Sequence, residues 1–148
     1  AETTLAAADV LAPGRWRERG IAAVTAAYFR LMVESTRRHH ALIRELVHRS
    51  RARNSTMVAE DAYDRFAAAV FEPFRALLLE RAAEVRHPDP ALAVRVGFSA
   101  CQSALREAIL CPHMRPTMGE IGDEELIGEV TRMLCGYLGA EYPEGESA

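Results

Sequence analysis

Residues 91–110, ALAVRVGFSACQSALREAIL, place the strongest constraint on the fold, because on a helix they form two apolar stripes. The first stripe holds the larger side chains, Val94, Phe98, Cys101, Leu105 and Ile109. The second stripe holds only small residues, Ala93, Gly97, Ala100 and Ala104. A helix that faces one core and then water needs a single apolar stripe of about 100°. The sequence therefore predicts that this helix packs on two sides.

The rest of the chain also shows helical spacing, and no stretch alternates with a period of two as a strand would. Pro73 lies inside one predicted helix and should kink it. Asp89 followed by Pro90 is typical of a helix start, Asp123 is the predicted cap of the last helix, and Gly139 is its predicted end. Helices are predicted over about 15–37, 39–52, 57–86, 90–110 and 123–138, with 1–12 as a further helical segment.

These helices predict one all-α domain, a bundle of five to six helices over residues 15–139. Residues 1–14 are expected to be the tail of a connecting helix or a linker, and residues 140–148 an acidic tail. In the 39–52 helix, the residues expected to point inward are Leu42, Ile43, Leu46 and Val47.

The net charge of −3 gives the chain no overall basic bias toward nucleic acid. Residues 37–53 do carry six Arg against one Glu, which could give weak, salt-dependent contacts with phosphate. No aromatic residue interleaves these arginines and no helix-turn-helix pattern surrounds them, so a solvated helix face is the favoured interpretation. We expect this chain by itself to recognise no specific DNA sequence.

Three cysteines without a CxxC pair argue against a disulfide framework and for a reducing compartment. The first residues lack the basic segment and apolar stretch of a signal peptide, and uncharged runs reach only about ten residues, too short to cross a bilayer. We expect a cytoplasmic protein that does not enter a membrane.

Two Glu-x-x-His motifs, Glu45 with His48 and Glu84 with His87, are the best candidates for metal chemistry. The first pair lies 130–170° from the apolar face of its helix by 100° spacing, and His87 is next to the helix-ending Pro88. Solvated charges are the favoured interpretation, and we expect no metal, no cofactor and no catalytic residue. A helical metal or redox protein stays as the alternative.

A proline-kinked helix beside aromatic and Met residues can leave a ligand cavity between helices, although such residues can equally fill a core. The expected ligand is hydrophobic or aromatic, because the inward positions carry no charge. The predicted lining is Tyr28, Met32, Leu46, Tyr63, Phe66, Val70, Phe74, Phe98, Cys101 and Leu105.

The small-residue stripe permits a close helix contact, either within the chain or with a second copy. Because the last helix also has a wide apolar face, we expect a two-fold, four-helix homodimer interface. Its predicted residues are Ala93, Val96, Gly97, Ala100, Ala104, Leu126, Val130, Met133 and Tyr137.

Residues 71–110, FEPFRALLLERAAEVRHPDPALAVRVGFSACQSALREAIL, resemble the C-terminal domain of TetR-family transcriptional regulators. The likeness lies in a long helix containing proline, a turn with Asp-Pro and a penultimate helix rich in Ala and Gly. The resemblance implies a four-helix dimer interface and a small-molecule pocket that controls two DNA-binding heads. The helix-turn-helix head of the family is missing here, so DNA contact would require such a head domain.

Overall fold

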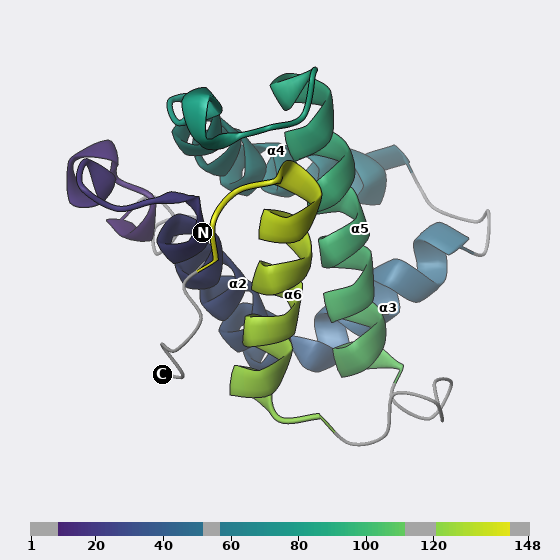
Figure 1. Ribbon diagram of the computed structural model, residues 1–148. Coiled ribbons are helices and arrows are strands. Elements are labelled where there is room, and N and C mark those ends of the chain that lie inside the picture. The colour runs from purple at the N-terminus through teal and green to yellow at the C-terminus, as the bar shows by residue number, and fades with distance from the viewer. Residues whose placement is uncertain (1–8, 52–56, 112–120, 143–148) are drawn as a thin grey trace.

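The computed structural model describes residues 9–51, 57–111 and 121–142, with side chains except at position 13 and in 46–51 and 57–67. These residues contain helices and no strand, which confirms the all-α prediction (Figure 1). The elements are the 3₁₀-helix η1 (Pro13–Trp16), α2 (Ile21–Arg38), α3 (His40–Arg51), α4 (Met57–Leu79), the 3₁₀-helix η2 (Ala82–Glu84), α5 (Pro90–Leu110) and α6 (Asp123–Leu138).

Helix α6 packs against both α2 and α5, and these contacts form the main body of the bundle. α5 and α6 run antiparallel, side by side, on one side of the molecule, with α4 behind them (Figure 1). Two ion pairs join α2 to the start of α6: Arg37 Nη2 lies 2.6 Å from Asp123 Oδ1, and Arg30 pairs with Glu124. Because both pairs link the second half of α2 to the first turn of α6, these helices also run antiparallel.

The start and the larger stripe of α5 agree with the prediction. Asp89 Oδ1 accepts a hydrogen bond from Leu92 N at 2.9 Å, and Pro90 occupies the first turn. Four members of the larger stripe are buried and Phe98 is half-buried against the core. The large side chains of α5 therefore face α2, α4 and α6 of the same chain.

The predicted 15–37 helix is wrong at its start, because α2 begins only at Ile21. The chain first forms η1, then reaches Gly20 in an extended conformation with φ −72° and ψ 175°. Trp16 is buried, and its indole Nε1 donates to the carbonyl of Val10 at 2.6 Å. The Ile21 amide donates to Glu84 Oε2 at 3.1 Å, so a residue distant in sequence caps this helix.

The predicted 57–86 helix is too long, because α4 ends at Leu79. Arg81 Nη1 donates to the carbonyl of Leu77 at 2.6 Å, which satisfies one acceptor left open at a helix end. The chain then turns through η2, and this turn brings Glu84 to the start of α2. The helix continues through Pro73, and the kink expected there stays a prediction.

The last helix is capped differently from the prediction. Gly122 is the N-cap residue, and Asp123 lies inside the first turn, where its carboxylate binds Arg37. The predicted end at Gly139 is confirmed, since this residue has φ 69° and ends the helix in the left-handed conformation that glycine tolerates.

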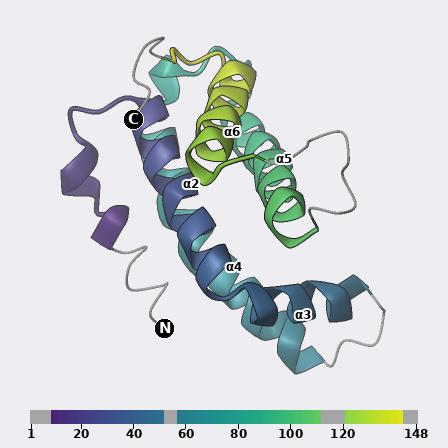
Figure 2. The ribbon, with the colours of Figure 1, turned by 90° about the horizontal axis from the view of Figure 1, so that it is seen from below.

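Helix α3 extends away from the body of the bundle (Figure 2). Ile43 packs against the core as predicted, but Leu42 is 61% exposed, so its predicted inward position is wrong. In the described part of the chain, α3 lies at the edge of the fold and has its main contact with α2. The side chains of Leu46 and Val47, like residues 1–8 and 143–148, lie outside the described residues.

Candidate ligand site and interaction face

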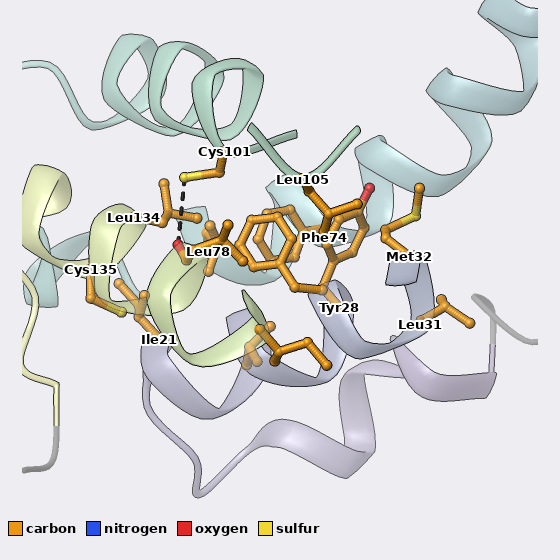
Figure 3. Close-up of a cluster of buried hydrophobic side chains, with 14 of the residues drawn as sticks. Ile21, Tyr28, Leu31, Met32, Phe74, Leu78, Cys101, Leu105, Leu134 and Cys135 are labelled. Carbon is orange, nitrogen blue, oxygen red and sulfur yellow. Dashed lines mark hydrogen bonds between the residues drawn. The ribbon is translucent and has the colours of Figure 1, made fainter. Parts of the chain in front are cut away.

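Three aromatic residues of the predicted ligand site come together from three helices. Tyr28 on α2 stacks on Phe74 of α4, with ring centroids 4.2 Å apart. Phe98 on α5 meets the Tyr28 ring edge-on at 5.5 Å and lies 5.8 Å from Phe74. The junction of α2, α4 and α5 is therefore an aromatic cluster, and Figure 3 shows Tyr28 and Phe74 beside Leu105 within it.

The other described members of the predicted lining are also in the protein interior. Met32, Val70, Cys101 and Leu105 are all buried. The side chains of Leu46, Tyr63 and Phe66 lie outside the described residues. Six of the ten predicted residues thus belong to the buried core and Phe98 packs against it, and a ligand among them stays a prediction.

One aromatic residue of this cluster was missed in the sequence analysis. Phe71 contacts Phe98 with ring centroids 4.3 Å apart and ring planes tilted by 34°. Phe71 lies three positions before Phe74, a spacing that places both rings on the same side of a helix. This spacing was the available signal for including it.

The buried cysteines Cys101 and Cys135 serve as packing residues. Cys101 Sγ donates to the carbonyl of Val130 at 3.5 Å, as the dashed line in Figure 3 shows. Burial raises the pKa of the Cys101 thiol to about 11, and burial together with the nearby Cys101 and Glu84 raises the pKa of Cys135 to about 11. Both thiols are protonated at neutral pH and lack the thiolate that a nucleophile needs. Cys101 is 1% exposed, in agreement with its predicted place on the larger apolar stripe.

The predicted dimer-interface residues divide into two groups. Ala93, Gly97, Leu126 and Val130 are buried within the single chain, and Ala104 is half-buried. Ala100 is exposed, as are three large side chains, Val96, Met133 and Tyr137, with relative exposures of 44–45%. Leu92, one turn before Val96, is 39% exposed. We call the exposed residues Leu92, Val96, Met133 and Tyr137 the α5–α6 face.

Part of the small-residue stripe serves packing inside the chain. A β-carbon at Gly97 would lie 2.7 Å from Leu134 Cδ1 and 2.8 Å from Tyr137 Cδ1, so α6 approaches the backbone of α5 at this point. Ala93 is fully buried one turn earlier. The alternative of a contact within the chain is therefore correct for the first half of the stripe, whereas Ala100 is left on the outside.

The Glu-x-x-His motifs do not converge where the structure describes them. Glu84 accepts the Ile21 amide, and His87 Nδ1 lies 2.9 Å from the Asp89 carbonyl and accepts the Asp89 amide at 3.1 Å. The side chain of His48 is outside the described part. Within that part, no group of three or more His, Cys, Asp and Glu residues is placed to hold a metal ion.

The basic run begins next to the acidic start of α6. Arg37 pairs with Asp123, so one of the six arginines in the basic run 37–53 already has a carboxylate partner.

Among the described helices, none has the length and apolar content that a bilayer span requires.

Comparisons of the chain with protein-family models, with curated proteins and with solved structures gave no match.

Proposed function

We propose that this chain is an effector-binding and dimerisation domain of the kind that forms the C-terminal part of TetR-like transcriptional repressors. The observation that carries the proposal is the α5–α6 face. It presents four large apolar side chains, each about two-fifths exposed, on one pair of neighbouring helices. Clustered exposed apolar residues mark interaction sites on protein surfaces, whereas scattered ones need no explanation.

A second copy of the same chain is the partner that this face fits best. Two antiparallel helices related by a two-fold axis to an identical pair form a four-helix bundle, in which each apolar patch covers its equivalent. Helices of 16 and 21 residues are about 24 and 32 Å long, and side by side they are about 20 Å wide. The projected area of about 500 Å² per copy brings the total to about 1,000 Å², the lower limit for a biological interface.

The aromatic cluster is the proposed ligand site. It brings together rings from α2, α4 and α5, and its neighbours Met32, Val70 and Leu105 are uncharged. Such a lining suits a small hydrophobic or aromatic molecule. A ligand that prefers one arrangement of these helices shifts the population of the dimer toward it, which is the linkage needed to release DNA. DNA binding itself is assigned to a helix-turn-helix head outside this sequence.

Light scattering after size-exclusion chromatography tests the dimer. The wild-type chain is expected to have twice the mass of one copy. Met133→Glu and Val96→Glu should give monomers, because each buries an unpaired carboxylate in the interface. Leu42→Glu is the matched control, since Leu42 is a large exposed apolar residue on α3, away from the α5–α6 face. A monomeric wild-type protein, or a Met133→Glu protein that stays dimeric, would contradict the proposal.

A further inference from the structure

Phe98 is the centre of the aromatic cluster. Its ring contacts Tyr28 at 5.5 Å, Phe71 at 4.3 Å and Phe74 at 5.8 Å between centroids. Phe98 therefore connects one ring of α2 and two rings of α4 to helix α5. A change at this ring would be felt by all three helices.

The cluster extends from the core to the surface. Tyr28 and Phe74 are 1% and 0% exposed, whereas Phe71 and Phe98 are only partly buried. The outermost ring contact is consequently the tilted Phe71–Phe98 contact between α4 and α5. Phe71 is the ring of this pair on α4, and it is partly exposed, so solvent already borders it.

We propose that Phe71 occupies the stacking position of the ligand, and that a planar, uncharged aromatic molecule binds by displacing Phe71 from the face of Phe98. This inference rests on the proposed ligand-binding function and specifies its site and ligand class. The Phe71 ring is tilted by 34° against Phe98, whereas a flat aromatic guest can lie parallel and offset on the Phe98 ring, so the guest recovers the ring contact that Phe71 loses. An aliphatic or charged molecule of similar size would not recover it.

The displacement also explains how a ligand would act on the helices. In the sequence, Phe71 precedes Pro73 and Phe74 follows it. Pro73 has no amide hydrogen to donate within α4. α4 therefore lacks the backbone hydrogen bond from position 73 to the carbonyl of Ala69, in the turn that carries Phe71. Displacement of Phe71 would act at this point, next to the Tyr28–Phe74 stack that joins α4 to α2.

Fluorescence titration with Nile red, an uncharged planar aromatic dye, tests the inference. Phe71→Ala should bind Nile red about two- to tenfold more tightly than wild type, because the internal competitor is removed. Phe98→Leu should bind at least about tenfold more weakly, and Phe71→Ala/Phe98→Leu should lose the gain of the single variant. Phe29→Leu is the control, since Phe29 is a buried ring that meets Tyr28 edge-on at 5.7 Å. Thermal melts by circular dichroism verify that every variant is folded.

The outcomes separate this inference from the function on which it rests. Saturable binding that is equal in wild type, Phe71→Ala and Phe98→Leu would overturn the stacking position and leave a ligand site elsewhere in the domain. Lack of saturable binding in the folded wild type and in folded Phe71→Ala would overturn both this inference and the ligand-binding part of the proposed function.

Discussion

Gly97 and Tyr137 approach each other so closely that a β-carbon at Gly97 would lie 2.8 Å from Cδ1 of the Tyr137 ring. The same atom would lie 2.7 Å from Cδ1 of the fully buried Leu134. Gly97→Ala gains about 1 kcal/mol of helix propensity, but the overpacking it causes costs about 1–3 kcal/mol. We expect a net loss of about 1 kcal/mol in the free energy of unfolding, measured by urea denaturation.

Gly128→Ala is the matched control for this change. Apart from the backbone of its own helix, a β-carbon at Gly128 would meet no atom of the described structure within 4 Å, although Gly128 also lies inside a helix. This variant should gain up to about 1 kcal/mol from helix propensity alone. Equal gains in the two variants would show that α5 and α6 do not approach closely at Gly97.

The helix spacing of residues 90–110 was sufficient to predict the helix, its larger stripe and the existence of a second packing surface. It could not identify which helix lies on the small stripe, because a partner in the same chain and one in a second copy require the same small residues. The structure separates the two possibilities along the helix: Gly97 meets α6 of its own chain, and Ala100 stays exposed.

The missed features depend on contacts between residues far apart in the sequence. Arg81 reaches Trp16 and Arg19, and Glu84 reaches Ile21, across more than 60 residues. Local periodicity carries no information about such contacts. Periodicity therefore predicted a first helix that begins too early, before Ile21, and a helix that ends too late, after Leu79. The cluster of Tyr28, Phe74 and Phe98 could be predicted, because helical spacing places these residues on inward faces.

Arg81 should be the residue that holds the N-terminal segment against α4. Its side chain is 10% exposed and donates to the carbonyls of Arg19 at 2.9 Å, of Leu77 at 2.6 Å and of Trp16. Arg81→Met leaves these carbonyls without their charged donor, and we expect a loss of about 2–3 kcal/mol in unfolding free energy. Trp16, the single tryptophan of the chain, should show a red-shifted fluorescence emission as it becomes solvated.

Arg75→Met is the control for the loss of an arginine. Arg75 pairs with Glu72 one helical turn away, at 2.8 Å, and both side chains are substantially exposed. Such surface pairs contribute about 0–1 kcal/mol, so stability should change little and the Trp16 emission should not move. A wild-type emission spectrum in Arg81→Met would contradict the role assigned to Arg81.

Thr25 and Thr131 should be sites where removing a hydroxyl stabilises the protein. Both residues are at most 1% exposed, and neither Oγ1 has a hydrogen-bond partner in the described structure. Thr→Val keeps the shape and removes a polar group that was buried without compensation, so each change should add about 1 kcal/mol to the unfolding free energy. Thr25→Ser, which keeps the hydroxyl, should give no gain. Loss of stability in both valine variants would show that these hydroxyls are paired in solution.

Cys101 and Cys135 should make the fold sensitive to alkaline pH. Burial raises the pKa of each thiol to about 11, whereas a thiol in an unfolded chain ionises near pH 8.5. Between these values the folded chain binds more protons than the unfolded chain, so stability present below about pH 8.5 is lost as the pH rises toward 11. The free energy of unfolding should fall by up to about 1.4 kcal/mol per pH unit for each thiol.

Urea denaturation between pH 8 and 10.5 in a reducing buffer measures this slope. The double variant Cys101→Ala/Cys135→Ala should have a shallower slope than wild type. An identical slope in the two proteins would show that these thiols do not keep their protons in the folded state.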